Sequence, residues 1–131
     1  MIDLTSCYLL AVLLRSTQRA ELWKAFKDHL IDTFGVPTLL FSNRGSQFAS
    51  AYWCKQCQIF TIHSETTPAY HPEANGIAES WHCMLKNAIS WDCQNNKEWS
   101  NRLPMTLLGL RAQPHLDSGL SPHQQVFGTD R

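Results

Sequence analysis

The stretch that most constrains the fold of this chain runs from residue 34 to residue 86. It begins with FGVPTLLFSNRGSQF, in which a short apolar run leads into Asn43, Arg44 and Gly45. Its second half, TTPAYHPEANGIAESWHCMLK, is a loop with prolines and a glycine that leads into a helical pattern containing Glu79. Thirty-five residues lie between Asn43 and Glu79. With an aspartate at position 43, this arrangement would be a strong signature of metal-binding carboxylates, but the residue is asparagine.

The composition is that of a globular protein, and we expect the 131 residues to form one domain. Eleven basic and eleven acidic side chains cancel, so a nucleic-acid partner would have to be bound by local patches. The longest apolar run, residues 8–14, is too short to cross a bilayer, and no signal peptide is present, so we expect no membrane partner. Five irregularly spaced cysteines argue against a disulfide framework and for a reducing, intracellular setting.

Local patterns in the first half predict alternating strands and helices. Residues 2–5 and 9–14 are predicted to be two strands of a hairpin, with the turn near Ser6 and Cys7. A helix is expected from a cap at Ser16 or Thr17 to residue 34, where Gly35 ends it. Residues 38–42 predict a strand, residues 50–60 a helix and residues 61–64 a short strand.

The second half is predominantly helical. Residues 66–76 contain two prolines and a glycine and predict a loop, and apolar residues at helical spacing over 74–89 predict the helix that follows. Another helical stripe covers 99–110, where Pro104 predicts a kink or a short helix start. Ser121 and Pro122 predict the start of a short helix that ends at Gly128. Strands that come first and alternate with helices indicate an α/β layer.

Three polar positions on separate elements could form one site. Asp3 lies on a predicted strand, Asn43 at a strand end and Glu79 near a helix start. Carboxylates gathered in this way can hold two divalent ions about 4 Å apart, which activate the attacking oxygen and stabilise the leaving one in phosphoryl transfer. Magnesium and manganese prefer the hard oxygen ligands that acidic side chains supply.

The motifs FGVP, RGSQF, AYHPxxNGxxE and LK, in this order, resemble the integrase catalytic core of gypsy-like long-terminal-repeat retrotransposons and retroviruses. The resemblance continues through W…LP…LLGLR and SP…VFGT and so covers nearly the whole chain. It implies an α/β fold of the ribonuclease-H-like kind, a mixed β-sheet flanked by α-helices. It also implies an activity, the processing of element DNA ends and their joining to a target duplex. Because only two residues precede Asp3, we expect a core domain over 1–131 with its first strand truncated.

The resemblance carries roles over to individual residues. Asp3 and Glu79 match the family's first metal-binding aspartate and its glutamate, and position 43 matches the second aspartate, so the candidate catalytic and metal-binding set is Asp3, Asn43 and Glu79. The implied cofactor is Mg²⁺ or Mn²⁺. An amide offers a metal one neutral oxygen and cannot bridge two ions as a carboxylate does, so we expect weakened metal binding and lost or weak catalysis.

The family resemblance also implies which residues bind DNA. Tyr70 and Asn75 match loop positions that touch DNA, and Lys86 matches a DNA-contacting lysine. Ser80 and Cys83 stand where the family commonly has basic residues, which weakens phosphate contact. DNA and a homodimer or higher oligomer are the implied partners. The implied location is the nucleus, or the cytoplasm before nuclear entry.

Other interpretations stay open beside this one. A non-catalytic integrase-derived module for DNA binding or oligomerisation is the alternative function, and a ribonuclease-H-like nuclease of another kind is disfavoured by the HPEANG loop. The pair Cys54 and Cys57 has the spacing of a redox or zinc motif, but Cys57 falls on an apolar helical stripe, which favours ordinary helix residues. His71 precedes a proline and is predicted to be a loop residue instead of a ligand.

Overall fold

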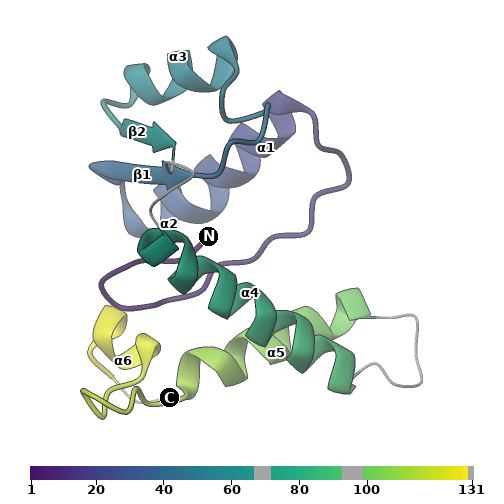
Figure 1. Ribbon diagram of the computed structural model, residues 1–131, viewed down its shortest axis with the longest axis vertical. Coiled ribbons are helices and arrows are strands. Elements are labelled where there is room, and N and C mark those ends of the chain that lie inside the picture. The colour runs from purple at the N-terminus through teal and green to yellow at the C-terminus, as the bar shows by residue number, and fades with distance from the viewer. Residues whose placement is uncertain (67–71, 93–98, 130–131) are drawn as a thin grey trace. The chain divides into compact units, whose positions relative to one another are not determined.

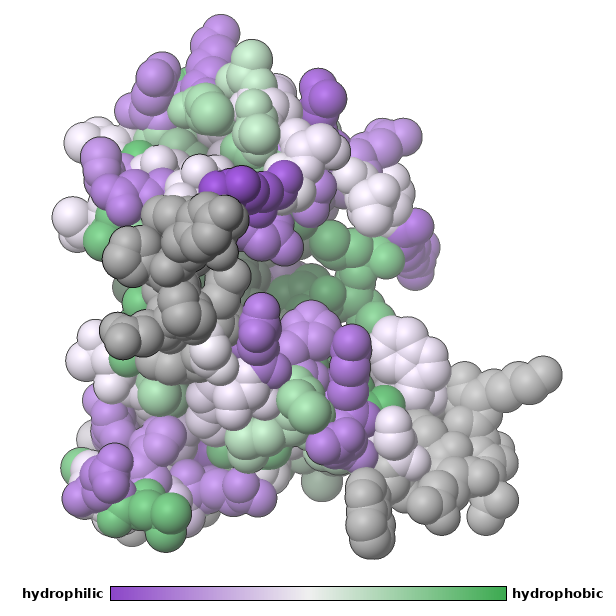
Figure 2. All heavy atoms as spheres, in the orientation of Figure 1, coloured by the Kyte–Doolittle hydropathy of each residue, from purple (hydrophilic) through white to green (hydrophobic). Residues whose placement is uncertain are grey.

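The computed structural model describes residues 1–66, 72–92 and 99–129 and divides into two compact units (Figure 1). Unit 1 contains Met1–Ala11 and Glu73–Arg131, and unit 2 contains Val12–Pro72. Each unit buries its own set of apolar side chains. On the face drawn in Figure 2, hydrophilic and hydrophobic residues are interspersed, in keeping with a chain that has no net charge.

Unit 2 begins with a helical segment in three parts: α1 (Arg19–Phe26), the π-helical turn η1 (Lys27–Ile31) and α2 (Asp32–Phe34). The helix predicted here is confirmed, but its predicted cap is wrong. The N-cap residue is Gln18, and the Ser16 hydroxyl instead accepts the Gln18 N–H at 3.1 Å, ahead of the helix. Gly35 ends the helix as predicted, with a φ of 88° that suits a residue without a side chain.

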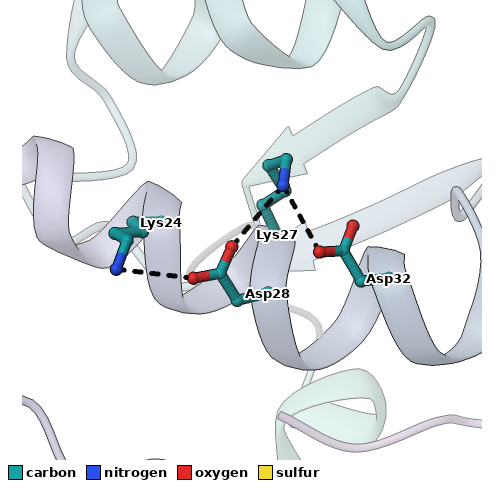
Figure 3. Close-up of polar contacts among 4 residues, drawn as sticks. All are labelled: Lys24, Lys27, Asp28 and Asp32. Atoms are coloured by element: carbon teal, nitrogen blue, oxygen red, sulfur yellow. Dashed lines mark hydrogen bonds and ion pairs between the residues drawn. The ribbon is translucent and has the colours of Figure 1, made fainter.

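Four charged side chains lie within and beside the π-helical turn: Lys24, Lys27, Asp28 and Asp32 (Figure 3). A π-helix brings residues five apart onto one face, and Lys27 Nζ accordingly lies 3.3 Å from Asp32 Oδ2. Lys27 also pairs with Asp28 at 3.5 Å, and Asp28 pairs with Lys24 at 3.6 Å. The hydrogen bond to Asp32 raises the pKa of Lys27. Because all four side chains are exposed to water, these pairs contribute little to stability.

A parallel pair of strands forms the sheet of unit 2, β1 (Leu39–Ser42) beside β2 (His63–Thr66). The helix α3 (Ala51–Ile59) connects them, as a parallel connection requires (Figure 1). The predictions for residues 38–42, 50–60 and 61–64 are confirmed, but the second strand starts two residues later than predicted. The strand starts later because the backbone of Thr61 and Ile62 is still hydrogen-bonded to the end of the helix. Thr61 has a φ of 57°, and the Ile62 N–H donates to Cys57 O of the helix at 2.8 Å.

Aromatic side chains dominate the core of unit 2. Trp53 is only 2% exposed, and its ring lies within 5.5 Å, centre to centre, of the rings of Trp23, Phe26 and Phe48. The cap of α3 orients this residue, because the Ser50 hydroxyl accepts the Trp53 N–H at 3.2 Å. Trp23 and Trp53 are therefore core residues of unit 2.

The helices in the described part of unit 1 are α4 (Pro72–Asp92), whose first residue still belongs to unit 2, α5 (Trp99–Ala112) and α6 (Pro122–Phe127). A stripe of α4 packs against a buried stripe of α5, and the residues in contact are Trp81, Leu85, Ile89, Leu103, Leu107 and Leu110. The helix α4 starts at Pro72, before the predicted residue 74, because proline suits the first position of a helix. The helix α5 starts five residues before Pro104 and continues past it, so the prediction of a helix start at Pro104 is wrong.

Local capping signals define α6. The Ser121 hydroxyl accepts the Gln124 N–H at 3.2 Å, and the Gln124 side chain accepts the Ser121 N–H at 2.7 Å. Gly128 ends the helix with a φ of 71°. This reciprocal pair is the predicted start signal, and it is confirmed.

The predicted N-terminal hairpin is present in a reduced form. Ile2 and Leu9 form a single antiparallel bridge, flanked by a hydrogen bond from Leu10 N–H to Met1 O at 2.9 Å. Residues 10–14 form no strand, contrary to the prediction, because the chain passes from unit 1 into unit 2 at Val12 and leaves the hairpin. Among the described residues, no helix combines the length and hydropathy of a membrane span.

Candidate metal and nucleic-acid site

Asp3 is held in the N-terminal turn of unit 1. Its N–H donates to Tyr8 O at 3.1 Å, which places the residue at the end of the antiparallel bridge. Its carboxylate oxygen Oδ2 accepts hydrogen bonds from the Ser6 N–H at 2.8 Å and the Ser6 hydroxyl at 2.6 Å. Ser6 is buried while Asp3 is exposed. The exposed carboxylate is therefore oriented by a buried neighbour before any ligand is present.

The sequence prediction did not include Ser6 as a functional residue. A signal for it exists, because a serine three residues after an aspartate can bond back to the carboxylate within one turn. The turn needs a positive φ of 55° at Cys7, which an unbranched residue tolerates better than a β-branched one.

Asn43 follows directly after β1 in unit 2 and is exposed. Its side-chain oxygen Oδ1 accepts the Gly45 N–H at 3.0 Å and so closes a turn of the asparagine type. An amide has one oxygen, and its other arm is an NH₂ donor that repels a cation. An aspartate could keep the same turn with one oxygen and present the other to a metal ion. The oxygen that Asn43 could offer to a metal already serves the turn.

Glu79 and Lys86 lie on the long helix α4. Both are exposed, and they are seven residues apart, so they share one face of the helix. Cys83 lies between them and is also exposed, and its sulfur accepts a weak hydrogen bond from Asn87 Nδ2 at 3.7 Å. Cys83 therefore adds no positive charge to this face.

The other two predicted DNA-binding residues, Asn75 and Tyr70, are not found where they were predicted or are not described. Asn75 was expected on a loop, but it lies inside α4, because that helix already starts at Pro72. Tyr70 lies outside the described residues, as does His71. The roles of Tyr70, Asn75 and Lys86 in DNA binding stay predictions.

The structure places Asp3 and Glu79 in unit 1 and Asn43 in unit 2. Within residues 1–66, 72–92 and 99–129, no three His, Cys, Asp or Glu side chains lie close enough together to hold a metal ion. The candidate set offers two carboxylates and an amide whose oxygen is engaged. An amide at position 43 cannot bridge two ions as a carboxylate does.

The Cys54 and Cys57 pair has the character of ordinary helix residues. Both sulfurs are free thiols on α3, and Cys54 is exposed whereas Cys57 is 2% exposed in the core of unit 2. Burial raises the pKa of the Cys57 thiol, which keeps it protonated and unreactive. The interpretation of this pair as structural is confirmed.

Alkylation should distinguish the two thiols. With iodoacetamide at mildly alkaline pH, Cys54 should react faster than Cys57 by roughly tenfold or more, because Cys54 is exposed to solvent whereas Cys57 is buried. Peptide mass spectrometry after timed quenching measures both rates in one sample. In urea the two rates should converge. Equal rates in the folded protein would contradict the burial of Cys57.

The proteins that this chain resembles in sequence are much longer than the chain itself. An uncharacterized protein of Caenorhabditis elegans is 28% identical over 95% of this chain and 11% of its own length. The Gag-Pol polyprotein of avian reticuloendotheliosis virus is 28% identical over 76% of this chain and 9% of its own length. The chain thus spans about a tenth of the length of these relatives. No protein-family model matches it.

Two integrase catalytic core domains are among the solved structures that this chain resembles. The magnesium complex of the HTLV-2 integrase catalytic core domain in its trimeric form matches with a TM-score of 0.76 and 21% identity, over 95% of this chain and 80% of that one. The catalytic core domain of BIV integrase matches with a TM-score of 0.80 and 19% identity, over 97% and 82%. These matches confirm the predicted α/β fold of the ribonuclease-H-like kind.

Proposed function

We propose that this chain is an integrase catalytic core domain of the retroviral and retrotransposon type, that it descends from an enzyme that joins DNA ends, and that it has itself lost most of that activity. One observation carries the proposal: the oxygen of Asn43 closes the turn to Gly45 at 3.0 Å and leaves no anionic oxygen at this position. On this proposal residues 1–131 form the catalytic core domain of a longer protein.

Asp3 and Glu79 would hold the divalent ion. The HTLV-2 core is known as a magnesium complex, and we infer Mg²⁺ or Mn²⁺ for this chain by analogy. The ion would polarise a phosphate oxygen and activate the attacking oxygen. Ser6 would orient the Asp3 carboxylate for it. With two carboxylates instead of three, the affinity for the ion should be lower than in an intact site.

DNA would contact the exposed face of α4. Lys86 supplies a positive charge there, and the positions of Tyr70 and Asn75 precede it in the chain. Cys83 and Ser80 contribute no charge, so phosphate binding on this face would depend strongly on Lys86. We place this activity in the nucleus, where chromosomal DNA is available as the target.

Self-association is part of the proposal. The HTLV-2 core has been solved in both a trimeric and a dimeric form, and another neighbour is an intasome of simian T-cell lymphotropic virus. These neighbours support a homodimer or higher oligomer for this chain.

The alternative function is a non-catalytic module that binds DNA or associates with itself. The engaged oxygen of Asn43 favours this alternative as well, because it removes catalysis without disturbing the fold. A gel assay of oligonucleotide strand transfer in Mn²⁺ separates the two. A slow, Mn²⁺-dependent product supports an impaired integrase. DNA binding or self-association without any product supports the module. Product formation as fast as in the Asn43→Asp variant would refute impairment.

Replacement of Lys86 tests the DNA contact. The Lys86→Met variant should bind duplex DNA more weakly at every sequence, and the slope of log K against log salt should fall by about one. Fluorescence anisotropy at several salt concentrations measures both quantities. Lys86→Arg keeps the charge and should retain the slope. An unchanged slope in Lys86→Met would remove Lys86 from the DNA interface.

A further inference from the structure

Arg111 connects the end of α5 to the N-terminal hairpin of unit 1. Its Nε donates to Leu9 O at 2.8 Å, between residues that are 102 positions apart in the chain. Its guanidinium carbon also lies 4.6 Å from the centre of the Tyr8 ring. A planar guanidinium can make both contacts at once, because it stacks with its face and donates from its edge.

The two residues that Arg111 contacts are those that pair with the segment carrying Asp3. Leu9 forms the antiparallel bridge with Ile2, and Tyr8 O accepts the Asp3 N–H at 3.1 Å. A displacement of Tyr8 and Leu9 would therefore shift the backbone of Asp3 directly. Because the hairpin consists of one bridge and a few flanking hydrogen bonds, it needs support from another element.

The surroundings strengthen the contacts of Arg111. The side chain is half-buried, and burial lowers the pKa of its guanidinium, which nevertheless stays charged at neutral pH. Its hydrogen bond is therefore less screened by water than a surface contact. The Tyr8 ring is also held from α6, where Phe127 meets it edge to face at 5.8 Å.

We propose that Arg111 is a positioning residue, which holds the hairpin through the Leu9 carbonyl and the Tyr8 ring so that Asp3 is presented in a fixed orientation to the divalent ion. The role of Asp3 as a metal ligand rests on the proposed function, but the contacts of Arg111 do not. The LLGLR motif thereby gains a role for its last residue, whereas two of its leucines, Leu107 and Leu110, form the core.

Amide hydrogen exchange tests the structural half of this proposal. In Arg111→Met, the amides of Asp3 and Leu10 should exchange roughly tenfold faster, the factor expected from loss of a hydrogen bond to a charged group. Amides in the middle of α5 should keep their rates. Arg102→Met, an exposed arginine of the same helix, is the matched control and should change none of them. An unchanged rate at Asp3 would overturn the proposal.

A milder variant covers the case in which Arg111→Met fails to fold. Arg111→Lys keeps a cation near Tyr8 but lacks the planar donor, so it should produce a smaller acceleration at the same two amides. Equal exchange rates in Arg111→Lys and the unmodified chain would also count against the proposal.

Metal dependence tests the functional half. In an Asn43→Asp background, Arg111→Met should raise the Mn²⁺ concentration for half-maximal strand transfer several-fold. A merely structural role would lower the maximal rate and leave the Mn²⁺ dependence unchanged, and that result would overturn the positioning role. If Asn43→Asp itself transfers no DNA, the proposed function fails, and the exchange rates still decide the role of Arg111 in holding the hairpin.

Discussion

The Asn43→Asp variant should join DNA ends faster than the unmodified chain by roughly three or more powers of ten. The reason is chemical and local. The aspartate can keep the hydrogen bond to Gly45 N–H, observed at 3.0 Å, with one oxygen and give the second to the metal ion. The restored charge lowers the barrier by several kcal/mol, since each factor of ten corresponds to about 1.4 kcal/mol. Strand transfer of a labelled oligonucleotide in Mn²⁺ measures the rate.

Two controls make this result specific to the metal site. Asn43→Ser can still accept the Gly45 N–H through its hydroxyl but has no carboxylate, so it should remain as slow as the unmodified chain. Adding Glu79→Gln to Asn43→Asp should abolish the gain, because it removes the second carboxylate of the proposed site. Comparable rates for the unmodified chain and Asn43→Asp would show that position 43 does not limit catalysis.

The largest effect on stability is expected at Trp53. Trp53→Ala should lower the free energy of unfolding by about 3–5 kcal/mol, because it empties the centre of the unit 2 core. The indole is 2% exposed and lies between 5.0 and 5.5 Å, centre to centre, from three other aromatic rings. A domain of this size is stable by about 5–15 kcal/mol, so this loss is a large share of the total. Urea denaturation followed by circular dichroism measures it.

The neighbouring residue Tyr52 provides the matched control. Its side chain is 38% exposed on the same helix, so Tyr52→Ala should cost much less than Trp53→Ala. Trp53→Phe should fall between the two. Within the described part of the chain the indole Nε1 has no hydrogen-bond partner, and phenylalanine removes this buried polar group while it keeps most of the apolar contact. Similar losses in Trp53→Ala and Tyr52→Ala would contradict the assignment of the core.

The sequence predicted elements well where a signal lies within a few residues. The serine cap of α6 and the stop at Gly35 both depend on neighbours inside one helical turn. Predictions failed where residues far apart in the sequence determine the local structure. Residues 10–14 have the composition of a strand, yet they form none, because the chain leaves unit 1 there. The π-helical turn at Lys27–Ile31 has no signal in the helical period of the sequence.

For the candidate site, too, local features could be predicted from the sequence and long-range contacts could not. Motif and spacing in the sequence point to Asp3, Asn43 and Glu79 as the candidate set, and their role in metal binding stays a prediction. The orientation of the Asp3 carboxylate by Ser6 is also local. The support of the hairpin by Arg111 is not, because Arg111 and Leu9 are 102 residues apart and meet only when α5 packs into unit 1.

By itself, the sequence determined the order of most helices and strands, the family resemblance and the presence of an asparagine at position 43. These properties depend on periodicity, on capping residues and on the chemistry of single side chains. None of these features depends on which other elements the segment packs against. Only the tertiary structure decided that Cys57 is buried while Cys54 is exposed, and that Arg111 holds the hairpin of Asp3. Burial and long-range hydrogen bonds arise when separate elements pack together, and no short stretch of sequence specifies which atoms will meet.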